Sequence, residues 1–163
     1  MKYIKYILLI LSCCISLSYS LDTTYTNVAI ATDKDAVSTQ DDLNVLVTLT
    51  HQEGWHSYWK NPGESGLATT IKWELPAGFQ AGDINWPMPQ AIQFGDLINF
   101  GFKDPVNLVI PIQINTSVKE GEHLLKGKIN WLVCKESCIP ESTSVSIPIK
   151  VGSTTQLSQQ ATK

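Results

Sequence analysis

Apolar side chains alternate with polar ones along most of this chain, and no other feature constrains its fold as strongly. The alternating segments are residues 27–32, 43–49, 71–75, 106–114, 125–133 and 145–151. A period of two residues indicates β-strands with one buried face, and no segment has a convincing helical period. Short strands separated by turn signals predict an all-β fold, an immunoglobulin-like antiparallel β-sandwich. A β-barrel is the alternative architecture.

Two cysteines, Cys134 and Cys138, lie just after the fifth alternating segment, in the sequence WLVCKESCIP. In one extended strand their Cα atoms would be about 13 Å apart, whereas a disulfide needs a separation of about 7 Å or less. The chain must therefore turn between them, through residues 135–137. We expect Pro140 to limit strand pairing just after this turn.

The same alternation predicts where Cys134 points. Trp131 and Val133 belong to the core-facing set of their segment. Because successive side chains of a strand point to opposite faces, Cys134 should lie on the other face, at or near the surface. A partly exposed thiol pair at the end of a hairpin would be accessible to another protein.

The first twenty residues have the composition of a secretory signal. A lysine-containing start precedes an apolar run at residues 6–17, and Ser18 and Ser20 are small residues at the positions that a signal peptidase recognises. The run is shorter than the ~20 residues needed to span a bilayer. We expect residues 1–20 to be a cleaved signal peptide, with lipoprotein anchoring at Cys13 as a minority alternative.

The rest of the chain is long enough for one domain with its own core. We expect that domain over residues 21–151 and a disordered polar tail over residues 152–163. Every basic residue is a lysine, and the formal net charge is −3. Nucleic acids and anionic membrane surfaces favour basic, usually arginine-containing patches, so neither is an expected partner.

The cysteine pair has three possible roles, which we rank by their chemistry. A disulfide that closes a five-residue loop restricts the unfolded chain by only about 2 kcal/mol, so it would be a weak structural staple. A metal site would have two thiolate ligands and no third, because His51, His56 and His123 lie far off in sequence. A redox-active pair therefore ranks above a structural disulfide, and a metal site ranks third.

Two further stretches carry more aromatic rings than ordinary strands and turns. Residues 54–66, with the sequence GWHSYWKNPGESG, enter a turn rich in glycine and proline. Residues 86–89 (WPMP) and 94–102 (FGDLINFGF) form the second stretch. A loop with exposed aromatic rings often covers a site, although such rings can equally form a satellite core.

Residues 54–66, 86–89 and 131–140 together resemble the N-terminal periplasmic domain of the thiol:disulfide interchange protein DsbD, particularly its ScsB-like branch. The similarity runs in order from about residue 27 to residue 151. It implies an immunoglobulin-like periplasmic domain whose cysteine pair takes electrons from a membrane-embedded partner domain. The pair then passes them to oxidised periplasmic proteins, without a cofactor.

The same resemblance implies roles for individual residues. Cys138 would form the mixed disulfide with partners, and Cys134 would resolve it. The cap or partner-binding residues would be Phe100, Phe102, Tyr58 and His56. The cysteines are closer together than in the best-known DsbD domains, and the chain ends soon after Val151. We therefore expect the reductant to come from a separate membrane-embedded electron donor, with a truncated gene product that has no such circuit as the alternative.

The sequence thus predicts a periplasmic thiol–disulfide exchange module, a component of a protein-disulfide reductase system. Its partners would be thioredoxin-like periplasmic proteins, with no small-molecule substrate, no cofactor and no metal. Whether the chain is itself an enzyme is left open. One alternative is a non-catalytic exported binding module with a structural disulfide. Another is a copper- or zinc-binding protein, because the ScsB-like branch is associated with copper tolerance.

Overall fold

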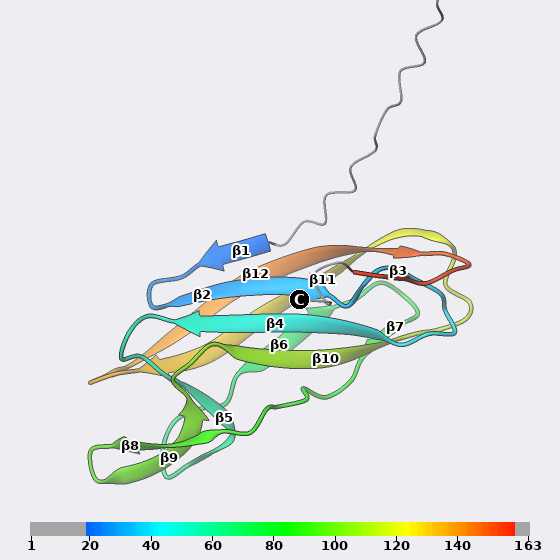
Figure 1. Cartoon of the computed structure of the whole chain (residues 1–163). Helices are drawn as coiled ribbons and strands as arrows, with labels where there is room; N and C mark the ends of the chain where they lie inside the picture. The colour runs from blue at the N-terminus through cyan, green and yellow to red at the C-terminus, as the bar shows by residue number, and fades with distance from the viewer. Residues whose placement is uncertain (1–18, 159–163) are drawn as a thin grey trace, which may run out of the picture.

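The computed structural model describes residues 19–158, which form β-strands and no α-helix (Figure 1). The strands are β1 (Tyr19–Asp22), β2 (Thr26–Thr32), β3 (Lys34–Val37), β4 (Leu43–His51), β5 (Ser57–Gly63), β6 (Thr70–Glu74), β7 (Phe79–Ala81), β8 (Gln90–Phe94), β9 (Leu97–Phe102), β10 (Val106–Ile114), β11 (Gly121–Cys134), β12 (Cys138–Val151) and β13 (Gln156–Leu157). Over these residues, no helix is long and apolar enough to cross a membrane.

Two five-stranded sheets make up the body of the molecule, in the orders β1-β2-β4-β10-β7 and β13-β3-β12-β11-β6. Their facing sides form one core of apolar residues. In β4 this core contains Leu43, Val45, Val47 and Leu49, and in β11 it contains Leu125, Ile129, Trp131 and Val133. Each set occupies alternate positions of its strand, as the sequence pattern predicts. The expected all-β, immunoglobulin-like sandwich is confirmed.

The β11–β12 hairpin is the longest ladder, with Cys134 opposite Cys138 and a turn through residues 135–137, as expected. The expectation that Pro140 limits pairing is wrong, because β12 continues through it opposite Leu132. Cys134 exchanges its backbone hydrogen bonds with His56 on its other side, at 3.0 and 2.9 Å. Because the backbone N–H and C=O of Cys134 both bond to His56, the Cys134–Cys138 pair is of the non-hydrogen-bonded kind. The two kinds of pair alternate along an antiparallel ladder, so the Leu132–Pro140 pair, two positions away, is also non-hydrogen-bonded. The missing proline N–H therefore costs no ladder bond.

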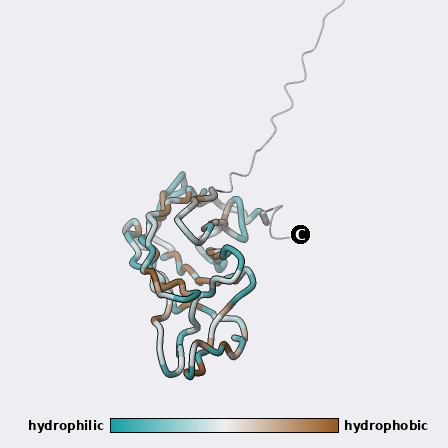
Figure 2. Tube along the Cα trace, turned by 90° about the vertical axis from the view of Figure 1, so that its left-hand side faces the viewer, coloured by the Kyte–Doolittle hydropathy of each residue, from teal (hydrophilic) through white to brown (hydrophobic). Residues whose placement is uncertain are grey.

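A smaller sheet in the order β5-β9-β8 projects from one end of the sandwich. It forms a separate lobe in the side view, below the two large sheets (Figure 2). The tip of this lobe carries exposed apolar side chains: Leu97 is 38% exposed, Ile98 55% and Phe100 39%. Strand β5 joins the lobe to the sandwich through the backbone bridge between His56 and Cys134.

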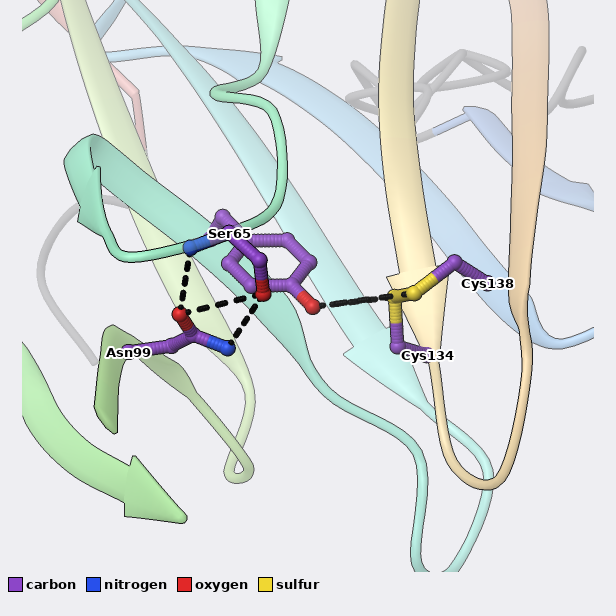
Figure 3. Close-up of a disulfide and its surroundings, with 5 residues drawn as sticks. Ser65, Asn99, Cys134 and Cys138 are labelled. Carbon is purple, nitrogen blue, oxygen red and sulfur yellow. Dashed lines mark hydrogen bonds between the residues drawn. A yellow bond between two sulfur atoms is a disulfide. The ribbon is translucent and has the colours of Figure 1, made fainter. Parts of the chain in front are cut away.

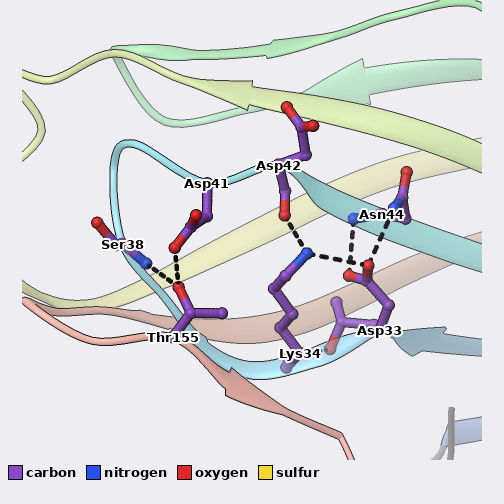
Figure 4. Close-up of polar contacts among 8 residues, drawn as sticks. Asp33, Lys34, Ser38, Asp41, Asp42, Asn44 and Thr155 are labelled. Carbon is purple, nitrogen blue, oxygen red and sulfur yellow. Dashed lines mark hydrogen bonds and ion pairs between the residues drawn. The ribbon is translucent and has the colours of Figure 1, made fainter. Parts of the chain in front are cut away.

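The chain after β12 is more ordered than expected. Within the predicted disordered tail, β13 pairs with β3, and the backbone N–H of Ser38 donates to Thr155 Oγ1 at 2.9 Å (Figure 4). Thr155 in turn donates to the Asp41 carboxylate. The expectation of disorder is thus corrected for residues 152–158, because a β-strand edge and side-chain hydrogen bonds hold this segment. Residues 159–163 lie outside the described part, as do residues 1–18 of the predicted signal.

A buried carboxylate, Glu141, ties β12 to the start of β2. Glu141 accepts hydrogen bonds from the backbone N–H of Tyr25 at 2.8 Å, from Thr23 Oγ1 at 3.0 Å and from Trp131 Nε1 at 3.1 Å. Trp131 Nε1 also donates to Thr26 Oγ1 at 3.1 Å. A buried charge needs such partners, because leaving it unpaired would cost several kcal/mol.

This network predicts different effects for two identical tryptophan substitutions. Trp131→Phe should lower the free energy of unfolding by about 1–3 kcal/mol beyond any packing loss, because it removes a donor to a buried carboxylate. Trp59→Phe should show no such loss beyond that of packing, because Trp59 Nε1 is buried without a hydrogen-bond partner among the described residues. Urea unfolding measures both. Equal losses would contradict the role given to the Trp131 indole.

Candidate functional site: a half-buried disulfide

Cys134 and Cys138 form a disulfide at the tip of the β11–β12 hairpin, with their Cα atoms 4.1 Å apart. The turn that the spacing required brings the two strands together. The two cysteines differ in exposure, since Cys134 is fully buried and Cys138 is exposed. Only one end of the bond is therefore open to an approaching protein.

The expectation that Cys134 lies at the surface is wrong. Alternation correctly directs it away from the core side that Val133 occupies, but β5 covers that other side. His56 pairs with the backbone of Cys134, and the hydroxyl of the fully buried Tyr58 contacts the sulfur. Val133 and Cys134, the last two residues of β11, are both buried because different layers cover them: the sandwich core covers Val133, and β5 covers Cys134.

Tyr58 makes the polar contact to the disulfide. Its hydroxyl donates to Cys134 Sγ at 3.0 Å and lies 3.7 Å from Cys138 Sγ. Burial raises the pKa of Tyr58, and a hydrogen bond with Ser65 acts in the opposite direction. The phenol therefore keeps its proton at neutral pH and can act as a hydrogen-bond donor.

The glycines of residues 54–66 make room for this tyrosine. Gly66 has a φ of +96°, and a Cβ at this position would lie 2.2 Å from the Tyr58 ring. A second glycine, Gly101, lies on the neighbouring strand β9, where it pairs with Tyr58 of β5. A Cβ on Gly101 would come within 2.0 Å of the Ser57 carbonyl oxygen. Both glycines thus permit close approaches that any side chain would block.

Two buried histidine rings belong to this region, and one of them contacts the tyrosine. The His56 ring is 5.3 Å from that of Tyr58, and burial, followed by the charge of Lys103, lowers its pKa. Burial also lowers the pKa of His51 to about 4; the nearby His56 acts in the same direction, and Glu141 opposes it. Both rings are therefore uncharged at neutral pH. Among residues 19–158, no group of three or more His, Cys, Asp or Glu side chains could hold a metal ion.

The phenylalanines of the second aromatic stretch have separate positions. Phe100, on β9, is 39% exposed and lies beside Gly63 of β5. Phe102 is buried in the main core and stacks on Trp86, so its assignment to the cap is corrected. It is Phe94 that contacts the surroundings of the disulfide, with its ring 6.1 Å from that of His56.

Sequence reasoning missed two residues, Ser65 and Asn99. The Asn99 side chain is fully buried in β9 and hydrogen-bonds with Ser65, in the turn after the neighbouring strand β5 (Figure 3). The signal available for Ser65 was its place between Gly63 and Gly66 in a turn. Asn99 gave no signal, because nothing local distinguishes it from a solvated loop residue.

The fold and this site define a β-sandwich domain that carries a one-sided disulfide at a hairpin tip. The sequence model of the family "Thiol:disulfide interchange protein DsbD, N-terminal" matches residues 27–149. The chain belongs to this family. No curated protein matches the chain.

Two solved structures are similar. The N-terminal periplasmic domain of ScsB from Proteus mirabilis has 25% identity and a TM-score of 0.60, over 81% of this chain and 50% of that chain. The DsbD N-terminal domain of Neisseria meningitidis, in the reduced form, has 17% identity and a TM-score of 0.51, over 81% of this chain and 90% of that chain. This chain thus spans about half of the ScsB chain that it matches. Family membership and the Cys134–Cys138 disulfide together support thiol–disulfide exchange.

The packing of Gly66 on Tyr58 predicts a large effect of one small substitution. Gly66→Ala should destabilise the fold by about 1–3 kcal/mol more than Gly95→Ala, because overpacking adds to backbone strain. Gly95 also has a positive φ, +61°, but a Cβ there would meet nothing within 4 Å. The pair of variants therefore separates the clash from the strain. Urea unfolding measures the difference, and equal losses would argue against the close contact.

Proposed function

We propose that this domain is a periplasmic thiol–disulfide exchange module that passes electrons from a separate membrane-embedded donor to oxidised thioredoxin-like proteins. The observation that carries the proposal is the asymmetry of the disulfide. Cys138 is exposed, while Cys134 is buried and accepts a hydrogen bond from Tyr58. This arrangement favours Cys138 as the sulfur that partners attack and Cys134 as the resolving cysteine. The periplasmic assignment rests on the predicted signal and on the periplasmic ScsB domain.

The domain is reduced in two exchange steps. A donor thiolate attacks Cys138 Sγ, the bond between the cysteines breaks, and its electron pair leaves on Cys134 Sγ. Tyr58 stabilises that leaving thiolate by its hydrogen bond. The donor's second thiolate then attacks the donor sulfur of the mixed disulfide and releases Cys138. The donor ends as a disulfide and the domain as a dithiol, with protons exchanged with water.

Electron delivery runs through the same atoms in reverse. The Cys138 thiolate attacks the partner's disulfide, and one partner sulfur leaves as a thiolate. Cys134 then attacks Cys138 Sγ, which re-forms the domain's own disulfide and releases the partner as a dithiol. Thiol–disulfide exchange needs no metal or cofactor.

Lys135, which follows Cys134 in the sequence, extends over Gly54, so its charge lies beside the loop before β5.

Single-cysteine variants test the assignment of roles. Reduced Cys134→Ser, which keeps Cys138, should form a stable mixed disulfide with an oxidised thioredoxin-like protein. Cys138→Ser should form it at least about tenfold more slowly, because thiol reactivity requires access. Non-reducing electrophoresis with mass spectrometry measures both rates. Faster trapping by Cys138→Ser would reverse the assigned roles.

The oxidised wild-type protein provides the control for function as a whole. After incubation with a reduced thioredoxin-like donor, its mass should increase by two hydrogens. If no transfer occurs while the fold stays intact, the disulfide is structural, and the exported binding module becomes the better interpretation.

The β8–β9 hairpin is the proposed cover of the pair, with Phe100 as its shielding residue. Phe94 contacts His56, whose backbone pairs with Cys134, and this contact supports the placement of the hairpin over the site. An exposed sulfur in an oxidising compartment invites unwanted exchange, and a movable loop limits it.

We expect Phe100→Ala to speed alkylation of the reduced cysteines by a small reagent while leaving thermal stability nearly unchanged. Phe102→Ala serves as the core control and should lose about 3–5 kcal/mol. A Phe100→Ala variant that loses stability like Phe102→Ala, with unchanged alkylation, would make Phe100 a core residue. Faster alkylation in Phe94→Ala alone would transfer the shielding role to Phe94.

A further inference from the structure

A groove of about 480 Å³ lies beside the disulfide, between the β11–β12 hairpin and the connection from β5 to β6. Leu67 and Ala68 of that connection, Leu132 of β11 and Pro140 of β12 line it. Leu132 and Pro140 form the cross-strand pair two positions from the two cysteines. Side chains two positions apart in a strand point to the same face, so the hairpin's part of the groove lies on the face that carries the disulfide.

Part of the groove wall is apolar and open to solvent. Leu67 is 66% exposed, and Pro140 is also exposed. Pro140 lies two residues from Cys138, about 7 Å along the strand. A stable protein–protein interface buries about 800 Å² on each partner, which corresponds to a patch about 30 Å across. A protein whose sulfur reaches Cys138 therefore also covers this groove.

Two lysines face each other farther along the same face of the sheet. Lys128 of β11 is directly opposite Lys72 of β6, and both are exposed. Like charges in directly opposite positions destabilise a sheet. Among residues 19–158, the single ion pair within 4 Å joins Lys34 to Asp33, so no carboxylate of the described chain pairs with Lys72 or Lys128. An anionic group from another molecule would relieve this repulsion.

The lysine pair lies at the edge of an interface that is centred on the disulfide. Lys128 precedes Cys134 by six residues, about 20 Å along the strand. Charges at the rim of an interface mainly change the rate of association, whereas apolar contacts nearer its centre hold the complex together. Glu141 also lines the groove, but its carboxylate already accepts three hydrogen bonds from within the chain.

We infer that the groove and the Lys72–Lys128 pair together form the surface on which the thioredoxin-like partner docks during exchange. The inference rests on the proposed function. The partner that fits carries an apolar side chain beside its reacting cysteine and carboxylates about 20 Å from it. The apolar contact holds the two proteins together while the sulfur bonds exchange, and the lysines raise the rate of encounter.

Two synthetic peptides test the charge preference. Both have one cysteine, leucine two positions away on either side, and serine elsewhere except six positions from the cysteine, about 20 Å away in an extended chain. The acidic peptide has glutamate at those positions, and the basic peptide has lysine. Each cysteine is joined to thionitrobenzoate by a disulfide. The Cys138 thiolate of the reduced Cys134→Ser protein attacks the peptide sulfur, that disulfide breaks, and thionitrobenzoate leaves as a coloured thiolate whose absorbance gives the rate.

We expect the acidic peptide to react at least about threefold faster at about 0.1 M salt, where charges interact over about 10 Å, and the two rates to converge at about 1 M salt. Lys72→Glu combined with Lys128→Glu should reverse the preference. Lys119→Glu combined with Lys150→Glu is the matched control, because it makes the same change in net charge at exposed positions. Lys150 is twelve residues beyond Cys138, about 40 Å along the strand, so the control should keep the preference.

Leu67→Ser tests the groove, with Leu157→Ser as its matched control. The two leucines are 66% and 68% exposed, so neither change empties the core. Leu67→Ser should slow reduction of the intact disulfide by a reduced thioredoxin-like donor about threefold at both salt concentrations, because an apolar contact is lost. Leu157→Ser should not slow it. Reduction by dithiothreitol should be unchanged in both variants, because a small reagent needs no docking surface.

Equal rates for the two peptides at about 0.1 M salt, or a preference that the control variant also loses, would overturn the role of the lysine pair. A donor rate that Leu67→Ser leaves unchanged, or slows no more than the dithiothreitol rate, would overturn the role of the groove. Failure of the proposed function looks different. Dithiothreitol would then reduce the wild-type disulfide and thioredoxin-like donors would not, whatever the preference between the peptides.

Discussion

The register of the β11–β12 hairpin is the constraint on which the rest of the structure depends. Its ladder runs from Gly121 opposite Val151 to Cys134 opposite Cys138 without interruption. A slip of one residue would turn every core side chain of a strand toward the outside, so burial of alternate residues fixes this register. The register that fills the core is also the one that sets the two cysteines opposite each other.

The hairpin alone would leave both sulfurs equally open. The small sheet makes them unequal, because His56 and Tyr58 cover the outer side of Cys134 and leave Cys138 free. This covering depends on two close approaches that only glycine permits, of Gly66 to the Tyr58 ring and of Gly101 to the Ser57 backbone. The chemistry of the site, a reachable sulfur beside a stabilised leaving sulfur, is thus a product of packing between two sheets.

Sequence patterns predicted the parts of the structure that depend on local repetition. The core strands, the sandwich and the turn at residues 135–137 follow from apolar alternation and from the reach of an extended chain. The same patterns predicted the wrong exposure for residues that another part of the fold covers. Cys134 is buried rather than exposed, and Phe102 belongs to the core rather than to the cap. Pro140 is accommodated because its nitrogen faces away from the partner strand.

By itself, the sequence determined an all-β sandwich and a cysteine pair that must meet across a turn, because both follow from strand geometry within one segment. The aromatic and glycine-rich motifs further predicted the family. Only the tertiary structure decided which cysteine is covered, that Tyr58 donates to it, and that Asn99 and Ser65 hydrogen-bond to each other. The Tyr58–Cys134 contact joins residues 76 positions apart, and the Ser65–Asn99 contact joins residues 34 positions apart. Their pairing depends on how the sheets pack rather than on any local periodicity.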